Sequence, residues 1–492
     1  MKILADVEVW AMDDTSNLVF WLVGMAGTGK STISQTVCEC LDAKDMLGAS
    51  FFCSRASNYT NNAYLIIPSI AYELARTSPS IKSEVIKAIE DDNRLTEPTY
   101  SNLEDLFTNN PLQKSIGNVK TIVIDGMDEC TNLDIFISLL KLILQYTHKM
   151  SLKIFISSQG EVSIRNVFGK HPNTLVLHEV EKDVVEDDIR RYITRKLDDI
   201  KSHFRIAEDD MDDGWPSPSE LSELIRCSGR LFIYAATAIH YIEDGKEDYQ
   251  HCLSNMVNSE PKSGSKQTSN IDILYGSILE QVFSSKEEDE VTPRRQLLSI
   301  IIFLRNLLSI QAILTLSGMG PCQLLSLLSS VIYIPSHMED TIAPFHASFP
   351  DFLTDPTHCS DECCPSFHAL SALDGHAILA LKCLEHLNNF SKYNICEVPA
   401  KSTVSCRETI NPLDGSNKVS KALKYSCVYW ASHLAELQLC GDESDLITAL
   451  RIFLEKHLLH WIEYLSVIGE LQTGLTSLRG VATALSVSSS LL

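Results

Sequence analysis

The chain has 492 residues, of which 45% are hydrophobic and 21% are charged, so it carries enough apolar material for more than one packed core. Two to four domains are therefore expected. The formal net charge of −23, from 41 Lys plus Arg against 64 Asp plus Glu, argues against a general electrostatic hold on nucleic acid or on an anionic membrane surface.

The cysteine content and the hydropathy of the chain favour a reduced compartment and no membrane span. The 15 cysteines are an odd number in a long chain, and no charged-then-apolar signal segment opens the sequence, so we expect a reduced, cytoplasmic protein. The longest apolar stretch, residues 297–316, carries Arg305 and Asn306 at its centre. Because an arginine there costs about 2.5–3.5 kcal/mol in a bilayer, we expect a pair of buried helices and not a membrane span.

The N-terminal part of the chain alternates apolar strand-like and helix-like runs, the pattern of a parallel α/β sheet. The predicted strands cover residues 19–23, 49–53, 121–124, 153–156 and 174–177, and the predicted helices cover residues 31–41, 66–76 and 133–146. After residue 180 apolar residues recur at helical spacing, so a helical region is expected to follow the sheet.

Loop-like segments divide the rest of the chain. An acidic loop over residues 208–219 and a Ser/Lys/Gly-rich linker over residues 260–270 mark boundaries, and short apolar runs at 331–334 and 343–346 predict the hairpin of a winged helix. The predicted domains are an α/β domain (1–180), a small helical domain (181–258), a winged-helix-like domain (271–355), a helical extension (365–470) and a disordered tail (471–492).

A P-loop follows the first predicted strand. Residues 24–31 read GMAGTGKS and precede a predicted helix, which is the context that this motif requires. Glycines let backbone N–H groups wrap phosphates, and the helix adds the positive end of its dipole. Lys30 is expected to pair with the β- and γ-phosphates, and the Ser31 hydroxyl to bind Mg²⁺. The predicted nucleotide-binding residues here are Gly24, Gly27, Thr28, Gly29, Lys30, Ser31 and Thr32.

An acidic segment, DGMDE over residues 125–129, ends the third predicted strand, on the side of the sheet where α/β proteins bind ligands. Asp125 is expected to hold Mg²⁺ through a water. Asp128 and Glu129 follow closely enough for one of them to polarise an attacking water as a general base, so both are candidate catalytic residues.

These two motifs resemble those of the NACHT family of signal-transducing P-loop NTPases, which belong to the STAND class. Four further segments resemble the fungal branch of that family, which has a nephrocystin-type N-terminal domain. They are residues 51–55 (FFCSR), 65–72 (LIIPSIAY), 229–236 (GRLFIYAA) and 346–353 (HASFPDFL). The resemblance implies an AAA-like α/β P-loop fold, followed by a helical domain, a winged helix and an α-helical extension.

The resemblance also implies a molecular switch, in which ADP holds a closed form and ATP opens it for assembly into a signalling oligomer. In closed relatives a winged-helix histidine touches the β-phosphate, and His346 lies at the matching position. We therefore expect ATP or ADP, with GTP as the alternative, together with Mg²⁺. Partners are expected to be further copies of the chain and proteins bound through the helical C-terminal region, but neither nucleic acid nor a membrane.

Relatives of this type commonly carry an N-terminal effector domain and a C-terminal WD-repeat propeller. The sequence shows neither. We therefore expect a truncated gene product, or a core that works with separately encoded partners.

One residue departs from the family pattern. Residues 153–158 resemble the family's first sensor strand, which normally ends in an arginine, whereas this chain has Gln159. A glutamine brings no positive charge against the charge that develops in phosphoryl transfer, so we expect slow or absent hydrolysis of ATP or GTP. Arg165 lies several residues further on and is a weak candidate to compensate.

Two alternative functions and one candidate metal site remain open. A non-switching interaction scaffold with a vestigial site is the main alternative, and a small-molecule kinase is a second. A Cys/His-rich segment, residues 358–368, has ligand types that could hold zinc, but its spacing fits no standard zinc motif.

Overall fold

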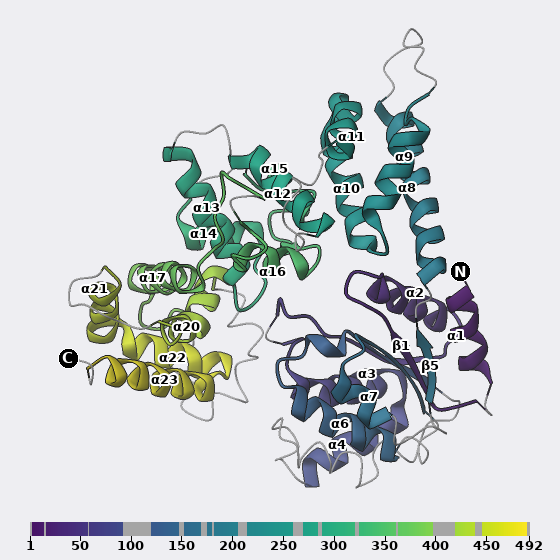
Figure 1. The fold of residues 1–492 in the computed structure, drawn as a ribbon. Helices are drawn as coiled ribbons and strands as arrows, with labels where there is room; N and C mark the ends of the chain where they lie inside the picture. Colours follow the sequence, from purple (N-terminus) through teal and green to yellow (C-terminus); the bar gives the residue numbers. More distant parts are fainter. Residues whose placement is uncertain are drawn as a thin grey trace. The chain divides into compact units, whose positions relative to one another are not determined.

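The computed structural model describes residues 2–13, 16–57, 59–91, 120–146, 152–168, 175–179, 182–204, 214–258, 269–283, 288–319, 324–360, 363–396, 419–437 and 445–489. The chain divides into two units, Met1–Ser259 and Glu260–Leu492 (Figure 1). The division falls at the start of the linker predicted over residues 260–270.

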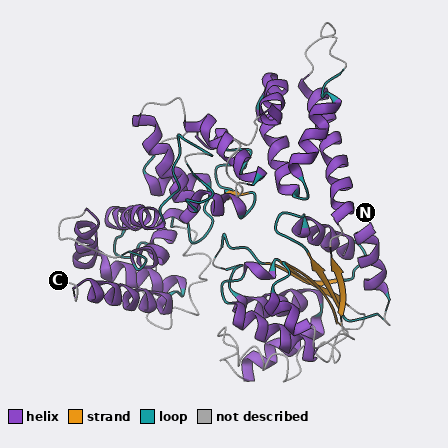
Figure 2. Cartoon of the chain, viewed as in Figure 1, coloured by secondary structure: helices purple, strands orange, loops and turns teal. Residues whose placement is uncertain are grey.

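A parallel five-stranded sheet lies at the centre of the first unit (Figure 2). The strands are β1 (Val19–Val23), β2 (Leu47–Phe52), β3 (Lys120–Asp125), β4 (Leu152–Ser158) and β5 (Leu175–Glu179), in the order β2-β3-β4-β1-β5. The register aligns Val23 with Ser158 and Phe52 with Asp125. Because all strand pairs are parallel, the carboxyl ends meet at one edge, where α/β folds bind ligands.

Helices cover both faces of this sheet, because alternate strand residues point to opposite sides. One core cluster joins Phe20 and Leu22 of β1 to α1 (Lys2–Met12) and α2 (Lys30–Asp42). The intervening Trp21 belongs to a second cluster on the opposite face. That face carries η1 (Ala63–Leu65), α3 (Ile66–Thr77), α4 (Pro79–Asp91), α6 (Leu133–Tyr146) and α7 (Val162–Phe168).

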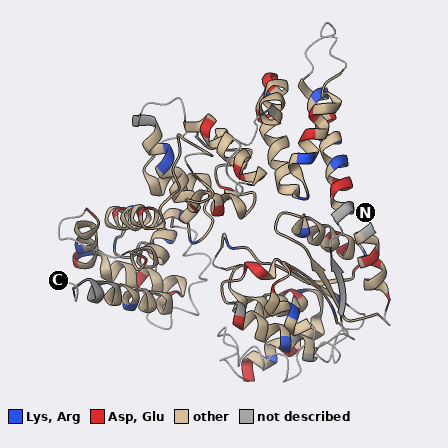
Figure 3. Ribbon diagram, in the orientation of Figure 1, with Lys and Arg blue, Asp and Glu red and all other residues tan. Residues whose placement is uncertain are grey.

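A bundle of helices completes the first unit. It consists of α8 (Lys182–Phe204), α9 (Pro218–Ser228), α10 (Phe232–Asp244), the turn η6 (Lys246–Asp248) and α11 (Tyr249–Asn258). A capping box starts α9: Ser217 Oγ accepts from Glu220 N at 3.2 Å, and Glu220 Oε2 accepts from Ser217 N at 3.0 Å. Basic and acidic residues are mixed along α8 (Figure 3), where Arg191 pairs with Asp187 at 2.6 Å.

The second unit begins with a winged-helix arrangement. Its elements are α12 (Asn270–Phe283), α13 (Glu288–Phe303), α14 (Ile310–Ser317), α15 (Leu324–Leu327), the antiparallel hairpin of β6 (Ile332–Tyr333) and β7 (Ala343–Pro344), and α16 (Ser348–Thr354). The apolar stretch over residues 297–316 is a helical pair, since α13 ends at Phe303 and α14 begins at Ile310. Of the helices that the structure describes, none is long and apolar enough to span a bilayer.

A helical extension follows in the same unit. It contains α17 (Ala372–Phe390), α20 (Lys421–Leu434), α21 (Asp445–Ile452), the π-helical turn η7 (Phe453–His457), α22 (Leu458–Ile468) and α23 (Leu471–Ser489). Trp430 and Trp461 pack edge to face in its core, with ring centroids 5.8 Å apart. The prediction of a disordered tail is wrong for α23. The helix packs so closely on α22 that a Cβ at Gly474 would lie 2.4 Å from a Leu465 methyl carbon.

Candidate functional site

The P-loop connects β1 to α2 at the carboxyl edge of the sheet. Gly24 N donates to Ser158 O at 3.3 Å, which fixes the start of the loop to β4. Gly27 and Gly29 have φ of 74° and 85°, in the left-handed region that favours glycine. Gly29 is also the N-cap of α2. The loop therefore places backbone N–H groups and a helix N-terminus around one space, the arrangement that binds phosphate.

The polar side chains of the P-loop lie at the start of α2. Lys30, the first residue of α2, is 9% exposed, and its Nζ donates to Gly24 O at 3.0 Å and to Met25 O at 2.9 Å. Burial lowers the pKa of Lys30, and the nearby carboxylates of the acidic segment oppose that shift. Ser31 and Thr32 are exposed in the first turn of α2. Lys30 is thus held at the loop and can exchange carbonyl oxygens for phosphate oxygens.

Asp125 ends β3 and is 2% exposed. Its Oδ1 accepts from Ser34 Oγ of α2 at 2.6 Å and also from Ser157 Oγ of β4. Ser157 Oγ in turn accepts from Gly126 N at 3.1 Å. Hydrogen bonds from two different elements restrict the rotation of a carboxylate, so both serines orient Asp125.

The acidic pair lies in a short 3-10 turn, η3 (Met127–Glu129), which begins after Gly126 at φ 68°. Asp128 Oδ1 accepts from Gln159 N at 2.8 Å, and Glu129 Oε2 accepts from Arg55 N at 3.2 Å. Burial raises the pKa of Glu129, the charge of Asp128 adds to the rise, and the Arg55 N–H opposes it. A carboxylate with a raised pKa is a better proton acceptor, so Glu129 is suited to general-base chemistry.

The end of β4 supplies Gln159 where the family pattern has an arginine. Gln159 contacts the acidic turn through its backbone N–H, which donates to the carboxylate of Asp128. Arg165, the weak candidate to compensate, donates from Nε to Gly160 O at 3.2 Å, and its guanidinium lies 5.9 Å from the centre of the Trp21 ring. The guanidinium of Arg165 therefore lies between the turn at Gly160 and the Trp21 ring.

The helical bundle of the first unit touches the P-loop. Ile233 N, at the start of α10, donates to Gly27 O at 3.4 Å. A Cβ at Gly27 would lie 2.7 Å from Ile233 Cγ2, and one at Gly29 would lie 3.5 Å from the Phe232 ring. The glycines therefore also allow the N-terminus of α10 to approach the loop. Sequence patterns predicted neither this contact nor the serines beside Asp125.

His346 belongs to the second unit and follows β7. Its Nδ1 accepts from Ser348 N at 3.1 Å and lies 2.8 Å from Ser348 Oγ. Because a backbone N–H can only donate, Nδ1 is unprotonated in this arrangement, and the proton of the neutral ring is on Nε2. The role of His346 as a nucleotide sensor stays a prediction.

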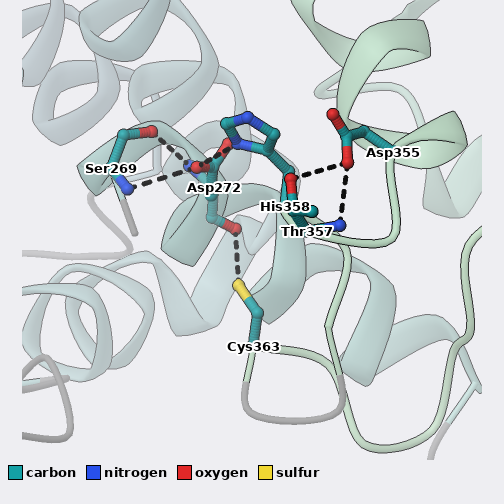
Figure 4. A network of polar contacts seen from close by, with 6 residues as sticks. All are labelled: Ser269, Asp272, Asp355, Thr357, His358 and Cys363. Carbon is teal, nitrogen blue, oxygen red and sulfur yellow. Dashed lines mark hydrogen bonds and ion pairs between the residues drawn. The ribbon is translucent and has the colours of Figure 1, made fainter. Parts of the chain in front are cut away.

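The Cys/His-rich segment is part of a polar network in the second unit. Figure 4 shows that Asp272 Oδ2 pairs with His358 Nδ1 at 2.9 Å and that Cys363 Sγ donates to Asp272 O at 3.2 Å. The hydrogen bond to Asp272 raises the pKa of His358. Within the ranges that the structure covers, no group of three or more His, Cys, Asp or Glu side chains is arranged to hold a metal ion.

Comparisons with known proteins give a family match and a curated relative. Residues 3–159 match the family described as Nephrocystin 3, N-terminal. Over 518 aligned residues the chain is 21% identical to the vegetative incompatibility protein HET-E-1 of Podospora anserina, covering 98% of this chain and 36% of the relative. The chain thus spans about a third of the length of that curated relative.

Two solved structures are similar at low identity. A signal transduction ATPase with numerous domains from Pyrococcus horikoshii, which has a tetratricopeptide repeat sensor, is 13% identical with a TM-score of 0.41, covering 99% of this chain and 63% of that chain. Cdc6p from Pyrobaculum aerophilum is 11% identical with a TM-score of 0.33, covering 71% of this chain and 90% of that chain.

The parallel sheet, the P-loop and the acidic end of β3 define an α/β P-loop NTPase fold. The match over residues 3–159 assigns this part of the chain to the nephrocystin-type N-terminal family, which is related to NACHT domains. The similarity to HET-E-1 supports the resemblance of the chain to NACHT-type STAND proteins.

Proposed function

We propose that the chain is a nucleotide-dependent switch that binds a nucleoside triphosphate with Mg²⁺, hydrolyses it slowly or not at all, and assembles in response, in intracellular signalling. The observation that carries the proposal is the convergence of Lys30, Asp125 and the start of α10 on one P-loop. The loop provides a phosphate site, and α10 provides an element that a bound phosphate can move.

The phosphates would be held by the backbone N–H groups of residues 24–31 and by Lys30, which lies within reach of the loop. The Ser31 hydroxyl and Asp125 are the proposed Mg²⁺ ligands, Asp125 acting through a water. Their residue types fit the ion, because Mg²⁺ prefers oxygen ligands and usually keeps several waters. A bound Mg²⁺ would neutralise charge on the phosphates during transfer.

Glu129 is the preferred general base and Asp128 the alternative. Both carboxylates are partly exposed, and both are fixed by backbone N–H groups from neighbouring elements. The described contacts place Arg165 at Gly160 and Trp21, so we propose that turnover lacks a cationic stabiliser from this strand and is slow.

The switch would operate through α10. In the described arrangement the Ile233 side chain packs against Gly27 and the Ile233 N–H donates to Gly27 O, so a ligand that repositions the loop must also move the start of α10. We further propose that His346, with its proton on Nε2, donates to a phosphate in the closed form.

Equilibrium binding tests the proposal. Fluorescent ATP and GTP analogues are titrated with and without Mg²⁺ into wild type, Lys30→Ala and the control Lys44→Ala, whose lysine pairs with Glu8 on the surface. Loss of the charged contacts should weaken binding about 100-fold in Lys30→Ala, from roughly 1.5–3 kcal/mol per charged hydrogen bond. If the wild-type protein binds neither nucleotide, the proposal fails and the alternative of a non-switching interaction scaffold is favoured. In a separate assay, phosphorylation of an added small-molecule acceptor would favour the alternative of a small-molecule kinase.

A further inference from the structure

Two thiols lie against each other beside the acidic turn of the site. The Sγ atoms of Cys53 and Cys130 are 3.4 Å apart, although the two residues are 77 positions apart in the sequence. Cys53 is 6% exposed and Cys130 is 8% exposed. The pair is therefore nearly enclosed, at the carboxyl edge of the sheet, with a small residual access from solvent.

Both cysteines are fixed by backbone hydrogen bonds. Cys53 directly follows β2, and its N–H donates to Asp125 O at 2.9 Å. Cys130 directly follows η3, and its N–H donates to Met127 O at 3.4 Å. Because two well-defined segments present the thiols to each other, their proximity does not depend on a flexible terminus or a long surface loop.

We propose that Cys53 and Cys130 are an oxidation site, at which a peroxide converts the two thiols into a disulfide that joins the end of β2 to the acidic turn. The two sulfurs must approach from 3.4 Å to about 2.05 Å, which is a movement that side-chain rotation and a small backbone shift can supply.

The reaction balances with one hydrogen peroxide per disulfide. The thiolate of one cysteine attacks a peroxide oxygen, an S–O bond forms, the O–O bond breaks, and the released hydroxide takes a proton to give water. The second thiolate then attacks the sulfenic sulfur, the S–S bond forms, the S–O bond breaks, and a second water leaves. Two thiols are oxidised, and one peroxide is reduced to two waters.

The surroundings favour Cys130 as the attacking thiol. The hydrogen bond with Cys53 lowers the pKa of Cys130, although burial and the neighbouring Glu129 and Asp128 oppose that shift. Cys130 is thus expected to form the sulfenic acid, and Cys53 to resolve it.

The disulfide would act on the nucleotide site, and this consequence rests on the proposed function. Cys130 is the residue after Glu129, and the carbonyl of Cys53 lies 3.1 Å from the position of a Cβ on Gly126. Drawing the two sulfurs together therefore displaces the turn that carries Asp128 and Glu129. A misplacement of about 1 Å can cost on the order of 100-fold in rate, so we expect hydrolysis to slow at least about tenfold on oxidation.

The test treats the full chain with hydrogen peroxide and maps disulfides by peptide mass spectrometry under non-reducing conditions. Wild type and the control Cys40→Ser, which removes an exposed thiol of α2, should yield a Cys53–Cys130 linked peptide that a reductant removes. Cys53→Ser should instead accumulate sulfenic or sulfinic acid at Cys130. Oxidation of other cysteines in wild type without the linked peptide would overturn the proposal.

A second readout separates this inference from the proposed function. Nucleotide binding and single-turnover hydrolysis are compared for reduced and oxidised wild type and for the double variant C53S/C130S, which should show no peroxide response. If the reduced protein binds no nucleotide, the proposed function fails, and the linked peptide still decides the oxidation site. A linked peptide with unchanged turnover would overturn the coupling of the disulfide to the acidic turn.

Discussion

At the residue scale, the carboxylate of Asp125 is held by side chains from two different elements. Its Oδ1 accepts from Ser34 and Ser157, which come from a helix and a neighbouring strand. The Lys30 side chain and the P-loop glycines are contiguous in sequence with the strand and helix that place them, so a local motif predicts them. The serines cannot be predicted this way, because Ser34 and Asp125 are 91 positions apart and meet only when α2 packs on β3.

Removal of the Ser34 hydroxyl should weaken Mg²⁺-dependent binding. Ser34→Ala deletes a hydrogen bond to an ionised group, worth roughly 1.5 kcal/mol, so we expect about a tenfold loss of nucleotide affinity in the presence of Mg²⁺. With the ion chelated the affinity should change little. Thr36→Ala on the same helix, whose hydroxyl donates to Thr32 O, is the matched control. Equal losses with and without Mg²⁺ would exclude the proposed role of Ser34.

The carboxylate of Glu129 should control turnover. Glu129→Gln is expected to abolish single-turnover hydrolysis and to leave nucleotide affinity within about twofold, because a general base acts on the chemical step. Since burial raises its pKa, the ionised base is lost at a pH above the ordinary value of 4.5, and the rate should fall as pH falls through that range. If Asp128→Asn abolishes hydrolysis and Glu129→Gln does not, Asp128 is the base.

At the scale of elements, the strands of the sheet could be predicted from short apolar runs, whereas their order in the sheet and the helices α1 and α23 could not. The N-terminal helix α1 is held by Lys153 of β4, which is 1% exposed and donates from Nζ to Asp13 O at 2.6 Å, to Ser16 Oγ at 2.8 Å and to Trp10 O. The segment of α23 is rich in serine and threonine, which are weaker helix formers, so its helix depends on packing against α20 and α22 and not on local propensity alone.

Replacement of Lys153 should loosen α1 from the sheet. Lys153→Met leaves three acceptors without their donor, so we expect a loss of roughly 2–3 kcal/mol in the free energy of unfolding, measured by chemical denaturation. Lys44→Met breaks the exposed pair with Glu8, which also links α1 to the rest of the unit, and should cost under about 1 kcal/mol. Similar losses in both variants would show that the buried position of Lys153 is unimportant.

At the scale of the whole molecule, a buried pair of histidines in the second unit should make the stability of the protein fall in acid. In the second unit, His433 Nδ1 lies 3.0 Å from His376 Nδ1 and its Nε2 lies 2.8 Å from Tyr425 OH. Burial lowers the pKa of both histidines, with Arg305 adding to the effect and Glu436 opposing it at His376. The unfolded chain then binds more protons than the folded one.

The contribution of this histidine pair is therefore fully present above the ordinary pKa of 6.5 and is lost as pH falls below it. The melting temperature of wild type should drop between pH 7 and pH 5 more steeply than that of His433→Gln, which cannot protonate. His337→Gln, which removes an exposed histidine of the same unit, should keep the wild-type slope. Parallel slopes for wild type and His433→Gln would contradict this account.

The winged helix and the bundle of the first unit could be predicted as elements, but their coupling could not. The contact of Ile233 with Gly27 joins residues of two predicted domains, and no local pattern specifies which residue of a helix reaches a loop. The domain limits given from sequence stay predictions. The first two of them lie together in one unit of the structure.

Molar mass in solution tests the central claim most directly. Wild type and Lys30→Ala are measured by light scattering after chromatography in ADP with Mg²⁺ and in a slowly hydrolysed ATP analogue with Mg²⁺, and the bound nucleotide is identified in each peak. We predict a monomer with ADP and an oligomer with the triphosphate for wild type, and no nucleotide and no change of mass for Lys30→Ala. An identical mass and identical bound nucleotide for both proteins in both conditions would contradict the account.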